Sequence, residues 1–332
     1  MSPQTGTDNR IHRESWRRFA AICCILALLL TSCGAGSGTG AETGSDNSSG
    51  AEEITVAAAD SGTESKGGYQ PPDMKTSAFH EDRAEAGLID LSCVSHGYVA
   101  VSATSDARLK FQVLKDDMTY NYDLASDGTP SVFPLQCGDG TYTFRIMENV
   151  VDTKYAEYYS TYENVVLDNE FEPFLRPSDY VNYNKNSACV AKAAEFSAEA
   201  ETKLDVVASV YRFVTKSIKY DKEKADNIQS GYLPDPDETM NTGRGICFDS
   251  ASLAAAMLRS QGIPTKVVFG YVSPDDVYHA WNMFYTEETG WVTAKFAVDQ
   301  NTWNRIDLTF AASGTSEKYI GDGSNYADVY YY

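Results

Sequence analysis

Histidine and basic charge are both scarce in this sequence. Its 332 residues include 4 histidines, and 27 lysines and arginines stand against 47 aspartates and glutamates, giving a formal net charge of −20. A surface that binds nucleic acid needs a basic footprint to neutralise phosphates, so this balance argues against a nucleic-acid partner. The small number of histidines leaves little material for histidine-based chemistry, so each one can be considered separately.

A long hydrophobic run is also missing. The apolar segment 19–30 follows four arginines and is shorter than the roughly 20 residues that a transmembrane helix needs. Its length is that of a signal-peptide core, and it ends in Leu-Thr-Ser-Cys at 30–33, which resembles the bacterial lipobox. We therefore expect residues 1–32 to be a lipoprotein signal peptide. Cys33 would then carry a lipid that anchors the chain on the extracytoplasmic face of a bacterial cell membrane.

The segment that follows Cys33 has almost nothing to bury. Between residues 34 and 68, 19 of 35 residues are glycine, serine or threonine. Such a composition is typical of a flexible linker. We assign residues 33–80 to a flexible tether between the membrane and the folded part.

Seven cysteines are present, of which Cys93, Cys137, Cys189 and Cys247 lie beyond the predicted signal and lipid site. Exported proteins can form disulfides. Cys93 and Cys137 both fall in strand-like segments and could be joined, but spacing alone leaves this pairing open. Cys189 lies among alanines in a predicted helix, where a buried structural cysteine is expected.

The segment 88–168 is predicted to be a β-sandwich domain. Apolar and polar residues alternate in it, with Leu109, Phe111 and Val113 as an example. A period of two is typical of strands with one buried face. About seven such strands separated by turn residues fit a small antiparallel sandwich. No group of catalytic residues is found in this segment.

From residue 172 onward, helices come first and strands follow. Ser187 can cap a helix, and apolar residues recur at helical spacing over 204–218. A third helix begins near Ile246 and ends before Gly262. Strand-like segments lie at 265–271, 279–285, 291–298, 306–310 and 326–332. This order indicates an α+β domain over 172–332.

Cys247 follows a glycine-rich turn and stands at the start of the third helix. The dipole and the free N–H groups of a helix N-terminus lower the pKa of a thiol there and favour the nucleophilic thiolate. The same N–H groups can stabilise an oxyanion. A buried structural cysteine is the other interpretation of Cys247.

Among the histidines, His279 is the best available partner for Cys247. His12 leaves with the predicted signal, His80 lies at the edge of the tether and His96 lies in a turn. His279 begins a strand of alternating apolar residues, where a structural role is the alternative. A thiol nucleophile needs a base that takes its proton and passes it to the leaving group, and His279 can do this.

A third residue must hold the other imidazole nitrogen and fix its tautomer. Asp307 is placed in the strand predicted to follow, and Asp299, in a turn-like Asp-Gln-Asn sequence, is its rival. Composition does not choose between them. Asn241 is a candidate for a second oxyanion donor beside the Cys247 amide. One cysteine and one histidine do not supply a multi-ligand set, so we expect no metal or other cofactor.

Several segments resemble the bacterial transglutaminase-like superfamily. They are 245–251 around the cysteine, 258–271 across the end of the third helix, and the His-Ala-Trp-Asn sequence at 279–282. The segment 210–221 is similar to the part of the family that precedes the cysteine. The likeness extends from about residue 174 to the carboxyl end of the sequence.

Proteins of this superfamily share a papain-type arrangement, in which a cysteine on a helix meets a histidine and an aspartate on adjacent strands. The resemblance implies Cys247 as the nucleophile, His279 as the base and Asp307 as the orienting group. It also implies an α+β transglutaminase-like, papain-like fold, here preceded by a small antiparallel β-sandwich domain.

The expected function is that of a membrane-tethered, thiol-dependent acyl-transfer enzyme. It would be a peptidase, an amidase or a protein transglutaminase with peptide or protein substrates at the cell surface, cell-wall peptides included. The alternative is a non-catalytic surface module that uses the same fold for binding or adhesion. The 22 tyrosines favour this alternative, because tyrosine supplies contact area with a polar tip.

Overall fold

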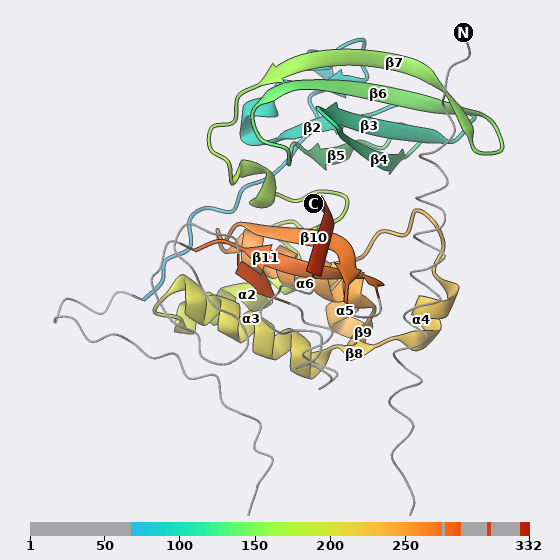
Figure 1. The fold of residues 1–332 in the computed structure, drawn as a ribbon. Helices are drawn as coiled ribbons and strands as arrows, with labels where there is room; N and C mark the ends of the chain where they lie inside the picture. Colours follow the sequence, from blue (N-terminus) through green and yellow to red (C-terminus); the bar gives the residue numbers. More distant parts are fainter. Residues whose placement is uncertain (1–67, 274–275, 287–303, 307–325) are drawn as a thin grey trace, which may run out of the picture.

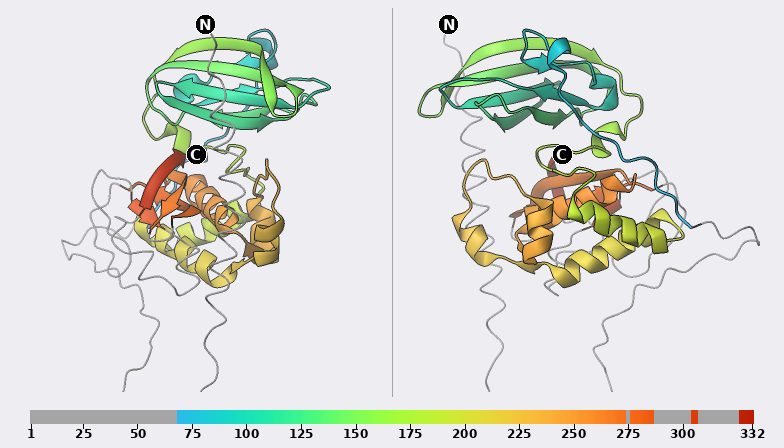
Figure 2. Two further views of the ribbon diagram at one scale, coloured as in Figure 1. Left: turned by 45° about the vertical axis from the view of Figure 1, so that its right-hand side comes forward. Right: turned by 180° about the vertical axis from the view of Figure 1, so that it is seen from behind.

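A computed structural model of the protein describes residues 68–273, 276–286, 304–306 and 326–332. They form a β-sandwich stacked on a second domain of helices and one larger sheet, with most helices on the side away from the sandwich (Figures 1 and 2). Within the described ranges, no helix is both long and apolar enough to span a membrane. The predicted signal peptide, Cys33 and the predicted tether up to residue 67 lie outside these ranges.

The sandwich consists of two antiparallel sheets. One has the strand order β1 (Ile89–Asp90), β2 (Tyr98–Val101), β5 (Ser131–Pro134), and the other β4 (Met118–Leu124), β3 (Leu109–Lys115), β6 (Gly140–Val151), β7 (Lys154–Val165). The predicted period of two is confirmed, because Leu109, Phe111 and Val113 are buried while the residues between them are partly exposed. The Phe111 ring lies 4.7 Å from the ring of Phe133 on the opposing sheet, so the two sheets share one core.

The second domain begins with helices. Those described are α2 (Ala188–Glu199), α3 (Lys203–Ser217), α4 (Lys222–Asn227), α5 (Pro236–Thr242) and α6 (Cys247–Ser260). Thr202 and Asp205 form a capping box at the start of α3, in which the Asp205 carboxylate accepts the Thr202 N–H at 2.9 Å. The predicted stop of the third helix is confirmed, since α6 ends at Ser260 and Gly262 follows with a φ of +74°.

An antiparallel sheet packs on α6. Its order is β12 (Asn304–Ile306), β11 (Val277–Phe284), β10 (Thr265–Val272), β13 (Tyr326–Tyr331). A parallel pair, β8 (Lys219–Tyr220) and β9 (Arg244–Gly245), leads into α6. All residues of α6 are buried, so this helix forms the centre of the domain. The α+β class is confirmed, whereas the strand expected at 291–298 lies outside the described residues.

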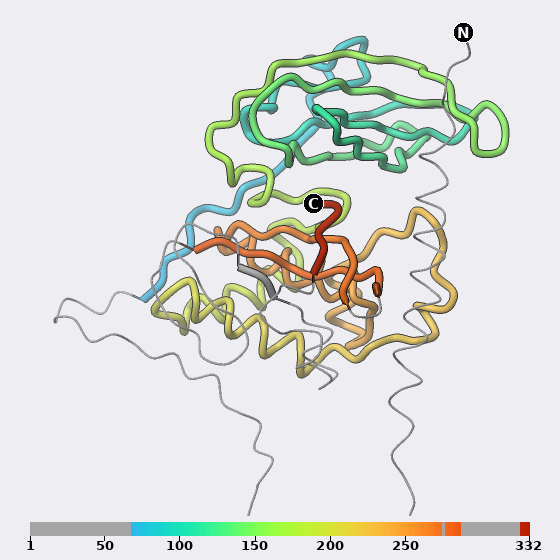
Figure 3. Tube along the Cα trace, viewed as in Figure 1, coloured from blue at the N-terminus to red at the C-terminus, as the bar shows by residue number. Residues whose placement is uncertain are grey.

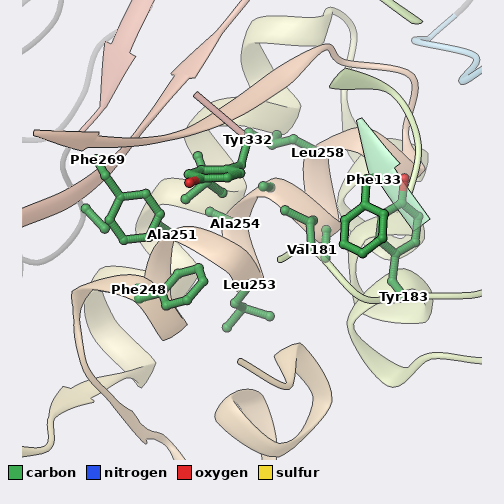
Figure 4. Close-up of a cluster of buried hydrophobic side chains, with 14 of the residues drawn as sticks. Phe133, Val181, Tyr183, Phe248, Ala251, Leu253, Ala254, Leu258, Phe269 and Tyr332 are labelled. Carbon is green, nitrogen blue, oxygen red and sulfur yellow. The ribbon is translucent and has the colours of Figure 1, made fainter. Parts of the chain in front are cut away.

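The two domains share one hydrophobic core. The ring of Tyr332, which follows β13, lies 5.9 Å from Tyr122 of the sandwich and 4.2 Å from Tyr180 of the connecting segment. On its other side it meets the Phe269 ring at 5.5 Å. Figure 4 shows Tyr332 and Phe269 together with Phe248 at the start of α6. Contacts of this kind hold the sandwich against the domain that contains Cys247.

Residues 68–80, which we call the N-terminal strap, differ from the prediction of a flexible tether up to residue 80. The strap runs from the helical side of the second domain to the sandwich, as the blue tube in Figure 3 shows. The Tyr69 N–H donates to Ala200 O at 2.9 Å, and the His80 ring bonds to the Asp90 carboxylate at 2.8 Å. The reason is composition: unlike the preceding segment, the strap contains Tyr69, two prolines and other apolar residues that can be buried.

The described cysteines are all free thiols. The disulfide considered for Cys93 and Cys137 is therefore not formed. Cys93 packs with Tyr98 and Ala100, while Cys137 lies at the edge of the main core. The expectation that both fall in strands is wrong, because Cys93 precedes a short 3-10 helix at 94–96 and Cys137 lies in the turn before β6.

Candidate active site

Cys247 is the first residue of α6 and is 1% exposed. The approach to it is fixed by Gly243, which ends α5 in a left-handed conformation with φ of 64°, and by the short strand β9. The first N–H groups of a helix have no partner within the helix and carry partial positive charge. The Cys247 sulfur is therefore placed where a thiolate, or an oxyanion formed beside it, would be stabilised.

The buried carboxylate of Asp249 holds this first turn in place. Asp249 is 0% exposed and lies two residues after Cys247. Its Oδ2 accepts the Ile246 N–H at 2.8 Å and forms an ion pair with Lys224 Nζ at 2.9 Å. Its Oδ1 accepts the hydroxyl of Tyr232. A buried carboxylate with three donors is well satisfied and fixes the backbone at the residue before the cysteine.

The groups around Asp249 come from the connection between α4 and α5. Lys224 lies in α4, and its ammonium also sits over the Tyr232 ring at 4.6 Å. Burial raises the pKa of the Tyr232 hydroxyl, and its hydrogen bond to the ionised Asp249 raises it further. Gly245 is needed here because a Cβ at that position would lie 2.7 Å from Asp249 Cβ. The sequence reasoning did not assign a role to Asp249, although an acidic residue in the first turn of a predicted helix is a recognised capping signal.

His279 lies in β11, opposite Gly270 of β10. Trp281 shares its face of the strand, and the two rings stack with centroids 6.4 Å apart. The alternate residues face α6, since Asn282 Nδ2 donates to Ala251 O at 2.9 Å. Gly270 allows close packing at this point, because a Cβ there would lie 2.8 Å from the Trp281 ring.

Tyr278, the residue before His279, belongs to the same hydrophobic core as Cys247. Burial raises the pKa of the Tyr278 hydroxyl above its ordinary value, and the charges of neighbouring groups, Cys247 among them, raise it further. The start of β11 and the start of α6 therefore contribute to one core. The elements that carry Cys247 and His279 are neighbours, and the pairing of the two side chains stays a prediction.

The remaining predicted site residues fall in different places. β12 pairs with β11 as the expected next strand and ends at Ile306. Asp307 follows it directly and, like its rival Asp299, lies outside the described residues, so the choice between them stays a prediction. Asn241 is an exposed residue of α5, and its assignment as an oxyanion donor also stays a prediction.

Cys189 shows the contrasting environment of a structural cysteine. It is 0% exposed in the first turn of α2. Burial raises the pKa of its thiol, and the neighbouring Asp237 carboxylate raises it further while accepting the Cys189 N–H at 2.9 Å. A thiol held protonated in this way is a poor nucleophile. The expectation that Cys189 is buried and structural is confirmed.

Known proteins resemble this chain over parts of its length. An uncharacterized protein of Mycobacterium leprae (strain TN), ML0607, is 28% identical over 179 residues, which cover 50% of this chain and 56% of that protein. The match thus spans about half the length of this relative. A candidate cysteine protease from Cytophaga hutchinsonii is 14% identical with a TM-score of 0.35, covering 71% of this chain and 84% of that one.

A further similar structure is the periplasmic domain of TgpA from Pseudomonas aeruginosa, 13% identical with a TM-score of 0.32, covering 65% of this chain and 94% of that one. Residues 190–296 match the family described as the transglutaminase-like superfamily. The matched range contains α6 with Cys247 and β11 with His279. Residues 190–296 of this chain are therefore a domain of the transglutaminase-like superfamily.

Proposed function

We propose that this protein is a membrane-tethered, thiol-dependent acyl-transfer enzyme that acts on peptide or carboxamide carbonyls. The observation that carries the proposal is the position of Cys247 at the first residue of a buried central helix, in a domain of the transglutaminase-like superfamily. The carboxylate of Asp249 supports it by fixing the backbone that presents the sulfur.

In the proposed reaction, His279 takes the proton of the Cys247 thiol and the sulfur adds to the carbonyl carbon of the substrate. Backbone N–H groups at the start of α6 donate to the resulting oxyanion. His279 then passes the proton to the departing nitrogen, the C–N bond breaks, and ammonia or an amine leaves while a thioester remains on Cys247. Asp307 would hold the other imidazole nitrogen throughout.

The second half of the reaction decides the type of enzyme. If water attacks the thioester, the product is a carboxylate and the protein is a peptidase or an amidase. If a primary amine attacks, the product is a new amide and the protein is a transglutaminase. In both cases the attacking group gives up a proton and the Cys247 thiol is restored.

The test is alkylation of the folded chain with iodoacetamide at neutral pH, followed by mass spectrometry of each cysteine peptide. Cys247 is expected to react about tenfold or more faster than Cys189, which serves as an internal control because burial and the Asp237 carboxylate raise the pKa of its thiol. His279→Ala is expected to slow the reaction of Cys247 and to lower amidase activity about 100-fold or more. Equal rates for the two cysteines, with no effect of Cys247→Ala on activity, would sink the proposal.

A non-catalytic binding module is the second candidate function, and it is favoured by the burial of the two predicted catalytic residues. Cys247 and His279 are 1% and 3% exposed, so little of either residue is in contact with solvent. An activity-based thiol probe distinguishes the two functions. Labelling of Cys247 that is lost in His279→Ala supports the enzyme, and absence of labelling in the folded protein supports the binding module.

Attachment to the membrane through Cys33 is a separate part of the proposal. It is supported by the lipobox-like sequence at 30–33 and by the glycine- and serine-rich composition of the segment that follows. Growth of a bacterial host with an alkyne-tagged palmitate should label the full chain, and Cys33→Ser should abolish the label. Equal labelling of both proteins would contradict a lipid on Cys33.

A further inference from the structure

A cavity of about 590 Å³ lies between the sandwich and the domain of Cys247. Strands β3 and β4 line one side of it, and Tyr180 together with the α4–α5 loop at 230–233 lines the other. Only this loop falls within the matched range 190–296. The cavity is therefore a product of the way this chain packs its two domains, and its size is that of a small-ligand or side-chain site.

Aromatic rings form one wall of the cavity. The rings of Tyr122 and Phe133 lie 4.6 Å apart, and Tyr180 lies 5.7 Å from Tyr122. Two further tyrosines that line the cavity, Tyr155 and Tyr232, already have lysine ammonium groups over their rings, at 5.8 and 4.6 Å. Ring faces of this kind attract cations, and they also cover the methylene groups of a long side chain.

The two carboxylates that line the cavity, Asp123 and Asp179, differ in whether they form an ion pair. Asp123 forms an ion pair with Lys110 at 2.7 Å. Asp179, by contrast, accepts the Val132 N–H at 3.2 Å and has no ion pair with any lysine, arginine or histidine in the part of the chain that is described. Arg108 lies exposed at the rim. Of the two carboxylates that line the cavity, Asp179 is thus the one without an ion pair among the described residues, and Arg108 is an exposed cation of the same lining.

Asp179 and Tyr180 are close enough to influence each other. Burial raises the pKa of the Tyr180 hydroxyl, and the negative charges of Asp123 and Asp179 raise it further. Burial also raises the pKa of the Asp179 carboxyl, since its ionised form is poorly solvated there. A cation bound in the cavity would offset this loss of solvation.

The aromatic wall also connects the cavity to the candidate active site. The rings of Tyr180 and Tyr232 lie 5.4 and 6.3 Å from the ring of Phe248, which directly follows Cys247. The Tyr232 hydroxyl donates to Asp249, the carboxylate that fixes the first turn of α6. The ring of Phe248 therefore lies behind the part of the cavity wall that Tyr180 and Tyr232 form.

We propose that this cavity binds the primary ammonium side chain of a peptide, such as lysine, with the ammonium against Asp179 and the methylenes along Tyr180 and Tyr122. An ammonium fits better than a guanidinium because the Asp179 carboxylate already accepts the Val132 N–H and a hydrogen bond from the Ser131 side chain. A point charge can use one remaining lone pair of this carboxylate, whereas a guanidinium prefers two parallel bonds. The assignment of the bound peptide as the substrate of Cys247 rests on the proposed function.

The test is calorimetric titration of the full chain carrying Cys247→Ala with acetyl-Ala-Lys-Ala-amide and with the same peptide containing norleucine. The lysine peptide is expected to bind about tenfold or more tightly than the norleucine peptide, because a buried charge pair is lost in the latter. Asp179→Asn keeps an acceptor for the Val132 N–H and should remove this preference. Asp116→Asn makes the same charge change at a carboxylate of the sandwich that is 79% exposed, and should leave the preference intact.

The outcomes separate the two proposals. Equal binding of both peptides, no binding of the lysine peptide, or an unchanged preference in Asp179→Asn overturns the cavity assignment, whatever the reactivity of Cys247. A lysine preference that depends on Asp179 in the Cys247→Ala chain supports it even if the thiol of the unsubstituted protein proves inert. Melting curves of the variants confirm that each remains folded.

Discussion

Replacement of Asp249 by asparagine is the sharpest test of how the fold presents Cys247. Asp249 is 0% exposed, and its two oxygens serve the Ile246 N–H, the Tyr232 hydroxyl and the Lys224 ammonium. Asparagine has nearly the same shape but one acceptor oxygen, and its amide group is itself a donor. At least one of the two buried donors, Ile246 N–H or Tyr232 O–H, therefore loses its acceptor in Asp249→Asn.

The size of the effect follows from these contacts. Breaking a buried ion pair by removing one partner destabilises a protein by about 3–5 kcal/mol. Lys224 is 28% exposed and can turn toward water, which reduces the penalty on its side. One hydrogen bond to the remaining oxygen also survives. We expect Asp249→Asn to lower the free energy of unfolding by about 3 kcal/mol, near the lower end of that range.

Urea unfolding followed by tryptophan fluorescence measures this change in the right domain. Beyond the predicted signal peptide, the tryptophans of the sequence all lie after residue 280, and Trp281 is 1% exposed. The control is Asp226→Asn, which removes an exposed partner of Lys222 in α4 and should change stability by about 0.5 kcal/mol or less. A loss below about 1 kcal/mol in Asp249→Asn, or one equal to the control, would refute the structural role of Asp249.

Three further substitutions test other features of the structure. Gly245→Ala places a Cβ 2.7 Å from Asp249 Cβ. It should lower the free energy of unfolding, measured in urea, by about 1–3 kcal/mol. It should also slow the alkylation of Cys247, measured by mass spectrometry. Asp179→Asn should raise the melting temperature at pH 8, because burial raises the pKa of this carboxyl in the folded protein and its ionised form is therefore destabilising. The gain in melting temperature should disappear as the pH falls below the ordinary pKa of 3.8, where the carboxyl is protonated in both the folded and the unfolded protein. Gly262→Ala puts a Cβ into the ring of Pro72 and should release the N-terminal strap, which limited trypsin digestion would detect as faster cleavage within residues 68–80.

Two of these substitutions, Gly262→Ala and Asp179→Asn, have a control or an opposing result. Gly87→Ala imposes the same left-handed strain, with φ of +72° against +74° at Gly262, but its Cβ would meet no atom within 4 Å. Equal digestion of the two variants would show that strain, and not the Pro72 contact, releases the strap. A melting temperature for Asp179→Asn that is unchanged or lowered at pH 8 would contradict a destabilising buried carboxylate.

Much of the fold could be predicted because it depends on local patterns. The alternation around Phe111 set the faces of β3, and the Gly262 signal set the end of α6. The start of α6 at Cys247 was predicted within one residue. Short helices such as α5 were missed, although Asp235 followed by Pro236 is a known start signal. Such helices are brief and polar, so no period of apolar residues marks them.

The candidate site was only partly accessible to sequence reasoning for a physical reason. The chemistry of Cys247 depends on its position in one helix, which the sequence encodes locally. The burial of Asp249 depends on Tyr232 and Lys224, which are brought to it by packing of the α4–α5 connection. The exposure of Asp179 to a cavity depends on the contact between two domains. Neither arrangement leaves a periodic signal, because both join residues from elements that are not adjacent in the chain.

The N-terminal strap precedes the sandwich in the sequence but packs against the second domain, so cutting the sequence between the two domains does not separate them in space. A fragment that begins at residue 172 would contain every residue of the candidate site, yet it would expose the surface at Gln261 and Gly262 that Tyr69 and Pro72 cover. It would also leave the ring of Tyr332 without Tyr122. The smallest unit that preserves the surroundings of α6 therefore begins at the strap, and dissection of this protein into a catalytic half and a binding half would cut through a shared structure.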